Sequence, residues 1–278
     1  MNKFKIFACV ILLLFAVTVL YAQDKKVDRA AVPFSDPSKP GMIEASVHNG
    51  AITVKGYNGK EVIVEARVRG QLLSKEKEVS EQVKGMKRII GIPITGLTIE
   101  EKENVMEVST ASMKNTVDLT IQVPFNTSLE LSSHNNGDIT VENITGEIEV
   151  NHHNGKLTLT NISGAVVAHT FNGAILVTFN KIDPEKPMSF SNWNGDIDVT
   201  FPQDLKANVK IHSELGDIYS DYEISLTQSP QKQEKDKRKE GGKYRIAFDK
   251  SIYGTINGGG QEIQFKTFHG NILIRKAK

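Results

Sequence analysis

Apolar and polar residues alternate with a period of two along most of the chain, in short segments separated by glycine turns. Within the stretch from His134 to Phe179, five glycines follow one another nine residues apart: Gly137, Gly146, Gly155, Gly164 and Gly173. Alternation with this period predicts β-strands, and Asn-Gly pairs are typical of tight turns between strands. The pattern therefore predicts short strands that are joined by corners at regular intervals.

The alternation keeps a fixed frame around the turn glycines, which are Gly50, Gly137, Gly155, Gly173, Gly195, Gly216 and Gly270. Two residues after each glycine lies an aliphatic residue, namely Ile52, Ile139, Leu157, Ile175, Ile197, Ile218 and Ile272. A repeat this short cannot bury its own apolar face, whereas stacked coils share one core. We therefore predict an all-β fold, a β-solenoid or flattened β-helix with coils of about 18–22 residues. An antiparallel sandwich or roll is the alternative.

Backbone geometry explains the choice of residues in the turns. Glycine reaches positive φ without strain, and asparagine tolerates that region better than most other residues. The glycines Gly146 and Gly164 mark a second corner in each coil. The turn at Gly137 fits the frame when Asn135 is treated as a bulge. We expect a structural role, without ligands, for Asn49, Asn136, Asn154, Asn172 and Asn194.

Three segments depart from the repeat. Residues 71–90 carry apolar residues at helical spacing with charges opposite them, which predicts one short helix. Residues 23–40 are polar, contain three prolines and are interpreted as a linker. Residues 226–243 are highly charged and poor in strand-forming residues, which indicates a flexible insert. The β-strand-repeat domain is then expected to cover residues 41–278.

The N-terminus has the pattern of a secretory signal peptide. Lys3 and Lys5 precede an apolar run from Ile6 to Ala22, which is followed by the polar residues QDKK. We expect residues 1–22 to be cleaved, and the protein to be exported to the periplasm, the cell surface or the medium. An uncleaved membrane anchor is the alternative, because the run approaches the length that spans a bilayer.

Charge and cysteine content exclude several classes of function. The net charge is +1, which gives no basic footprint for nucleic acid. Cys9 is the only cysteine and lies in the signal segment, so we expect neither disulfides nor thiol chemistry in the mature chain. The sequence has no Gly-x-Ser-x-Gly motif and no phosphate-binding loop. We therefore expect no enzyme activity and no cofactor.

The order of motifs along the chain resembles a known family. The segments are VHNGAITVKGYNGKEVIVEARVRG, then VDLTIQVPFNTSLELSS, then NGDITVENITGEIEVNHHNGKLTLTNISGAV. Over residues 41–278 they are similar to the bacterial putative-adhesin β-strand-repeat domain of unknown function, a relative of the auto-transporter adhesin head domain. The resemblance implies a repetitive β-solenoid-like fold, export to the cell envelope and no established enzyme activity.

One outward-facing column of the predicted coils is rich in rings. Two residues before the turn glycines, with the bulge allowed for, lie His48, His134, His153, Phe171, Trp193, Glu214 and Phe268. The six ring-bearing members would stand at the coil spacing of about 4.8 Å and form a ridge. Such a ridge could bind sugar rings or a partner's aromatic groups, or it could simply stack on itself.

Two further clusters have alternative interpretations. The first cluster comprises His134, His152 and His153. Histidines can bind a metal, but no carboxylates of a known metal motif accompany them, so we expect no metal site here. The second could form an acidic patch across two coils that binds calcium or hydrolyses a glycoside, and it comprises Asp196, Asp198 and Asp217. Aspartate is more common in turns, so we expect a structural role for this patch.

These observations predict a non-enzymatic exported envelope protein, which acts in adhesion or scaffolding through a repetitive surface. The alternatives are a carbohydrate-binding or carbohydrate-active β-helix, and a membrane-anchored accessory of envelope stress. The expected partner is an envelope protein or a glycan. Membrane contact is expected only if the N-terminal segment stays uncleaved.

Overall fold

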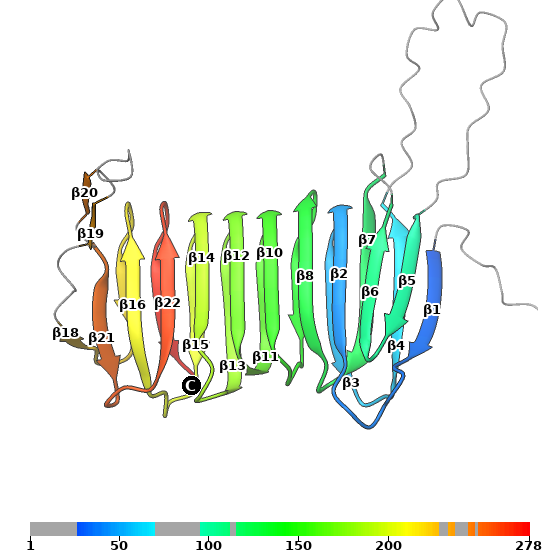
Figure 1. Ribbon diagram of the computed structural model, residues 1–278, viewed down its shortest axis with the longest axis horizontal. Helices are drawn as coiled ribbons and strands as arrows, with labels where there is room; N and C mark the ends of the chain where they lie inside the picture. The colour runs from blue at the N-terminus through cyan, green and yellow to red at the C-terminus, as the bar shows by residue number, and fades with distance from the viewer. Residues whose placement is uncertain (1–26, 70–94, 112–114, 228–232, 237–243, 248–249) are drawn as a thin grey trace, which may run out of the picture.

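The computed structural model describes residues 27–69, 95–111, 115–227, 233–236, 244–247 and 250–278. In these residues the fold is all-β, with a ten-stranded sheet A, an eleven-stranded sheet B and a two-stranded ribbon. Figure 1 shows the strands standing side by side in a long row, with β1 and β5 at one end and β18 at the other. The helix predicted within residues 71–90 lies outside the described residues.

Sheet A contains, in spatial order, β1 (Val27–Pro33), β4 (Glu61–Val68), β7 (Val117–Pro124), β3 (Ile52–Tyr57), β9 (Ile139–Glu142), β11 (Leu157–Gly164), β13 (Ile175–Ile182), β15 (Ile197–Phe201), β23 (Ile272–Lys276) and β17 (Ile218–Ser220). Sheet B contains β18 (Ser225–Thr227), β21 (Ile252–Ile256), β16 (Ala207–Ser213), β22 (Gln261–Thr267), β14 (Met188–Asn194), β12 (Val166–Asn172), β10 (Ile148–Asn154), β8 (Ser128–Asn135), β2 (Met42–Asn49), β6 (Val105–Thr110) and β5 (Leu97–Lys102). The ribbon pairs β19 (Gln233–Asp236) with β20 (Tyr244–Ala247).

Each central coil supplies one strand to each sheet, and neighbouring coils pair in parallel and in register. Val150 of β10, for example, lies between Leu131 of β8 and Ala168 of β12. The same register holds in sheet A, where β11 pairs in parallel with β9 and β13. The predicted solenoid-like stack of coils is therefore confirmed, and the antiparallel alternative is wrong for the centre of the molecule.

The predicted inward columns form the core between the two sheets. The aliphatic residues two positions after the turn glycines are 0% exposed at Ile52, Ile139, Leu157, Ile175, Ile197 and Ile272. Ile218 on the terminal strand β17 is only partly buried. One hydrophobic cluster runs from Phe34 to Ile274, so the coils share a continuous core.

The spatial order of the coils departs from their order in the chain at both ends. The coil β2–β3 lies between β6–β7 and β8–β9, although it comes first in sequence. The last coil, β22–β23, lies between β14–β15 and β16–β17. Because every coil carries the same alternating pattern, the pattern alone does not say which coils are neighbours.

Antiparallel strands close the stack. At one end β1 and β4 are antiparallel in sheet A and β5 is antiparallel in sheet B, while at the other end β21 and β18 are antiparallel in sheet B. The linker prediction for residues 23–40 is wrong over β1, which pairs with β4 along its whole length. Its Pro33 ends an edge strand, where a missing N–H is tolerated. The insert predicted at 226–243 likewise contains β19 and part of β18.

The asparagine column needs one correction. Asn135 pairs in register with Asn49, and its side-chain oxygen accepts a 3.0 Å hydrogen bond from Asn154 Nδ2. The extra residue is Asn136, which has a φ of 62°. The amide ladder continues from Asn172 to Asn154 at 2.8 Å and from Asn194 to Asn172 at 2.7 Å. These asparagines therefore bond one another across the coils.

Turn glycines are required for two different reasons. Gly155 and Gly173 have φ values of 147° and 143°, which side chains rarely adopt. Gly137 does not have a φ in that region, so the positive-φ explanation is wrong there. A Cβ on Gly137 would lie 2.3 Å from the backbone nitrogen of Ala51, because adjacent coils touch at this corner. Gly146 and Gly216 face the same limit from a neighbouring carbonyl oxygen.

Candidate functional site

The six predicted rings form an unbroken ladder on the outer face of sheet B, which we name the ring ridge. Neighbouring ring planes differ by only 4–14°. The centroid distances are 5.5 Å for His48–His134, 4.6 Å for His134–His153, 5.1 Å for His153–Phe171, 6.0 Å for Phe171–Trp193 and 4.3 Å for Trp193–Phe268.

The strand register places the rings in this order. Asn49 pairs with Asn135, which sets His48 beside His134. At the other end a bridge between Asn194 and His269 sets Trp193 beside Phe268. Phe268 therefore occupies the place after Trp193, ahead of Glu214, because β22 lies between β14 and β16.

Stacking determines which part of each ring a partner can reach. Every inner member of the ring ridge has a neighbouring ring on both faces, so its edge is what faces solvent. Phe171 and Trp193 are still 39% and 46% exposed. Sugar binding by aromatic residues uses a free ring face, which the inner members do not offer. The ridge instead presents ring edges, which suit edge-to-face contact with another protein's side chains.

A second outward column carries a row of acidic residues that sequence reasoning missed, here named the glutamate row. In spatial order it comprises Glu100, Glu107, Glu44, Glu130 and Glu149. A signal was present for part of it, because Glu44 and Glu149 both lie six residues before a turn glycine. Glu100 and Glu107 lie on strands without an Asn-Gly turn, so the alignment could not include them.

The glutamate row holds like charges side by side. Within the described part of the chain, none of its five carboxylates forms an ion pair with a lysine or arginine. Like charges directly opposite each other on adjacent strands are destabilising. The row is therefore a surface that a cationic partner would stabilise.

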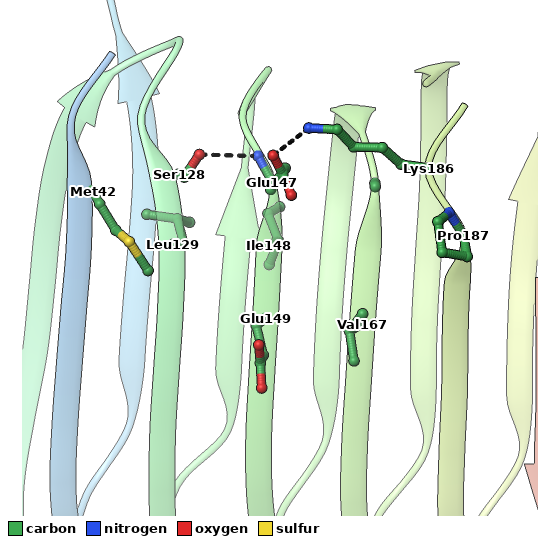
Figure 2. Close-up of a pocket in the computed structure, with 10 residues that line it drawn as sticks. Met42, Ser128, Leu129, Glu147, Ile148, Glu149, Val167, Lys186 and Pro187 are labelled. Atoms are coloured by element: carbon green, nitrogen blue, oxygen red, sulfur yellow. Dashed lines mark hydrogen bonds and ion pairs between the residues drawn. The ribbon is translucent and has the colours of Figure 1, made fainter. Parts of the chain in front are cut away.

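A hollow of about 410 Å³ opens on the same face, at the start of strands β8 to β14. Figure 2 shows the ion pair of Lys186 with Glu147 at its rim, and Met42, Leu129 and Val167 along its wall. The hydrogen bond to Glu147 raises the pKa of the Lys186 ammonium above its ordinary value. The hollow is mostly apolar, Lys186 and Glu147 neutralise each other, and Glu149 of the glutamate row adds a further negative charge to the lining.

The three histidines considered as a metal site do not point toward a common position. His152 is 3% exposed and its Nδ1 lies 2.9 Å from the carbonyl oxygen of Ser133, whereas His134 and His153 point outward. Among the residues described, no group of three or more histidine, cysteine or acidic side chains is placed to share a metal ion.

The acidic patch considered as an alternative for Asp196, Asp198 and Asp217 does not form. Strand β23 separates β15 from β17, so Asp198 on β15 lies about 10 Å from the strand that follows Asp217. Asp198 pairs with Arg275 at 2.7 Å. Asp196 accepts a 2.7 Å hydrogen bond from the backbone N–H of Asn271, which ties one corner to the next.

The fold and this surface define a class, a parallel two-sheet stack of β-coils that displays a continuous outer ridge. Residues 41–275 match the Toastrack DUF4097 family, and the chain belongs to that family. No curated protein matches the sequence. In the described residues, no helix is long and apolar enough to cross a membrane.

Solved structures with a similar chain path are distant in sequence. A "putative cell adhesion protein" of Clostridium sporogenes has 11% identity and a TM-score of 0.47, with 91% of this chain and 100% of that chain covered. A "putative adhesin" of Bacteroides fragilis has 10% identity and a TM-score of 0.28, with 91% and 98% covered. A "putative lipid binding protein" of Parabacteroides distasonis has 8% identity and a TM-score of 0.25, with 92% and 98% covered.

Proposed function

We propose that the protein is a non-enzymatic envelope protein that adheres to, or scaffolds, a protein partner through the outer face of sheet B. The observation that carries the proposal is the ring ridge. It runs unbroken across six coils, and its members Phe171 and Trp193 are exposed large apolar rings. A rigid double sheet with a continuous core holds these rings in place without further ordering on binding.

The non-enzymatic part of the proposal rests on the ion pair, the hydrogen bond and the burial that hold the candidate catalytic side chains within the fold. Asp198 is paired with Arg275, Asp196 accepts a backbone hydrogen bond, and His152 is enclosed in the core. A general acid or base must reach a substrate proton, and these groups are committed to the fold.

A protein partner is favoured over a glycan by the ring geometry. The stacked rings offer edges, and the neighbouring columns offer carboxylates and hydroxyls. The rings lie near the ends of their strands, and the columns of hydroxyls and carboxylates lie beside them on the same face. Protein interfaces combine aromatic with polar side chains in this way. If the wild-type protein bound a glycan array and the Trp193→Ala variant did not, the result would instead support the carbohydrate alternative.

Export is part of the proposal and rests on the pattern of residues 1–22, which lie outside the described residues. Cell fractionation with N-terminal sequencing tests it. We expect the mature protein to begin after Ala22 and to leave the membrane fraction on washing. An intact Met1 in the membrane fraction would support the anchored accessory.

The adhesion proposal is tested with cells that produce the full-length protein at equal levels. We expect Phe171→Ser and Trp193→Ser to reduce cell-to-cell or cell-to-surface attachment several-fold, because each exposes a hydroxyl where the contact needs an apolar ring. Leu176→Ser, on the outer face of sheet A, is the matched control and should leave attachment unchanged. Equal loss in all three variants, or no loss in any, would contradict the proposal.

A further inference from the structure

Exposed apolar side chains gather at the middle of the outer face of sheet B. Val167, Phe171 and Trp193 are 44%, 39% and 46% exposed. They lie on β12 and β14, which are the sixth and fifth of the eleven strands. The hollow lined by Met42, Val167 and Pro187 extends this apolar surface toward the start of the strands. Phe171 and Trp193 stack beside each other, whereas the exposed His169 separates Phe171 from Val167 along β12, so this apolar surface has two parts. Exposed apolar surface rimmed by polar residues marks an interaction site.

Charge is divided between the two halves of the same face. The glutamate row crosses β5, β6, β2, β8 and β10, all on one side of β12. On the other side, Lys266 of β22 and Lys210 of β16 point outward, and the Lys210 ammonium lies 5.4 Å from the centre of the Tyr253 ring. The same half also carries the exposed Glu262 of β22, and Glu214, which pairs with Lys250. The face is thus strongly acidic at one end, and at the other end it carries outward lysines among mixed charges.

A surface with this arrangement is complementary to itself after a half turn. We propose that two copies of this chain associate face to face through sheet B, about a twofold axis that lies in the interface parallel to β12. The rotation keeps the strand direction and exchanges the two ends of the sheet. The glutamate row of each copy then covers the half of the other that carries Lys210 and Lys266, and a twofold interface repeats each contact in this way. This inference rests on the proposed function and names its partner, a second copy.

The strand order fixes which residues meet. Strands β8 and β22 each lie two places from β12, and β2 and β16 each lie three places from it. Glu44 and Lys210 occupy the same outward column, so they face each other directly across the interface. Glu130 faces Gln264 of β22, which lies two residues before Lys266 on the same strand. At the centre, the two copies of Phe171 face each other through their edges. Trp193 of β14 then faces His153 of β10 in the other copy, because β14 and β10 each lie one place from β12.

The face is large enough for a stable dimer. The eleven strands range from the short β18 (Ser225–Thr227) to β2 (Met42–Asn49), and at about 3.3 Å per residue and about 4.8 Å between strands they cover about 1,100 Å². A standard interface buries about 800 Å² on each partner. A cationic peptide would cover only the glutamate row, whereas a second copy covers the acidic row, the apolar centre and the lysines together.

Sedimentation velocity of the purified full-length protein tests the inference. We expect a concentration-dependent dimer, and a blue shift of the fluorescence of Trp193, the single tryptophan, as the dimer forms. Phe171→Ser should weaken association at least tenfold. Lys181 is an exposed lysine at the end of β13 in sheet A, on the other side of the molecule. Lys181→Glu is therefore the control for the lysine-to-glutamate changes on sheet B described next, and it should leave the dimer intact.

A mixing experiment separates the proposed geometry from nonspecific association. The double variant Lys210→Glu/Lys266→Glu and the double variant Glu44→Lys/Glu130→Lys should each be monomeric, because like charges then meet across the axis. An equimolar mixture should form a heterodimer, which also shows that both variants are folded. Monomeric wild-type protein, or variants that associate with themselves as the wild type does, would overturn the inference.

Cell attachment and dimer formation in solution are measured separately, so that failure of one proposal can be told from failure of the other. A monomeric wild type whose Trp193→Ser variant still loses attachment would overturn the second copy as partner and leave the proposed function standing. Dimers that form in solution, with attachment unaffected by Trp193→Ser, would support the interface and contradict the adhesion role.

Discussion

Aromatic rings contact one another in an inner and an outer region of the described residues, and β14 contributes to both. Its Phe190 points inward and is 0% exposed, whereas its Trp193 points outward and is 46% exposed. The inner region, here named the phenylalanine cluster, comprises Phe179, Phe190, Phe201 and Phe265. The outer region is the ring ridge.

The ring angles in the two regions differ because of the number of sheets involved. Within one sheet, parallel strands in register stack like residues, as Phe179 and Phe201 do at 5.2 Å and 5°. Between the sheets the rings meet edge to face, at 77° for Phe179–Phe190 and 89° for Phe201–Phe265. The phenylalanine cluster therefore joins the two sheets, whereas the ring ridge joins only neighbouring strands of sheet B. We infer that the inner rings stabilise the fold and the outer rings serve contact.

The largest expected effect is on the phenylalanine cluster. Phe190→Ala removes a fully buried ring that contacts three others, so we expect the free energy of unfolding to fall by about 3–5 kcal/mol. Urea denaturation monitored by circular dichroism measures this. Phe190→Leu is the control and should recover most of the loss. A loss below about 1 kcal/mol for Phe190→Ala would contradict a cross-sheet role.

An intermediate effect is expected from alkaline pH at the end of the same core. Burial raises the pKa of Tyr222 to about 12, and its hydroxyl hydrogen-bonds the carbonyl oxygen of Pro202 at 2.7 Å. An unfolded tyrosine titrates near pH 10, so this contribution is complete below pH 10 and is lost as pH rises toward 12. The loss is at most about 3 kcal/mol.

Thermal melts of wild type and Tyr222→Phe between pH 9 and 12 check this expectation. The wild type should lose stability more steeply than Tyr222→Phe over that interval, because phenylalanine has no proton to release. Parallel curves would show that Tyr222 is not the group responsible.

The smallest effect on stability is expected in the ring ridge. Phe171→Ala removes two stacking contacts, each worth about 0.5–1.5 kcal/mol. Because Phe171 is 39% exposed, we expect the lower part of the summed range, a loss of about 1–2 kcal/mol. Phe171→Tyr keeps the ring and should be nearly neutral. Urea denaturation at a concentration where the protein is monomeric separates this loss from any effect on association.

Alternation and turn spacing predict the central coils well. The frame around the turn glycines placed Ile139 and Ile175 in the core, and it placed Phe171 and Trp193 in one outward column. These positions follow from period two and from parallel register, which both act locally. The partners of the ring ridge were not available from the same frame, because every residue in an outward column can serve either stacking or binding.

The ends of the stack were harder to predict because long-range pairing decides them. β1 becomes a strand through pairing with β4, despite its proline and its charged residues. The coil β22–β23 inserts between two earlier coils, which separates Asp198 from Asp217. At the corner before Gly137, two adjacent asparagines share one ladder position: Asn135 pairs with Asn49 in register and accepts a hydrogen bond from Asn154, whereas the Asn136 side chain donates to Asn49. This division depends on the neighbouring coils and cannot be read from the local sequence.

The central claim, that outer rings serve contact and inner rings serve stability, is tested most directly by one paired measurement on Phe171→Ser and Phe190→Ala. Urea unfolding and sedimentation velocity are recorded for each variant beside the wild type. We predict that Phe171→Ser stays within about 2 kcal/mol of the wild type in unfolding and loses self-association, whereas Phe190→Ala loses about 3–5 kcal/mol. A Phe171→Ser protein that associates like the wild type but is as unstable as Phe190→Ala would contradict the account.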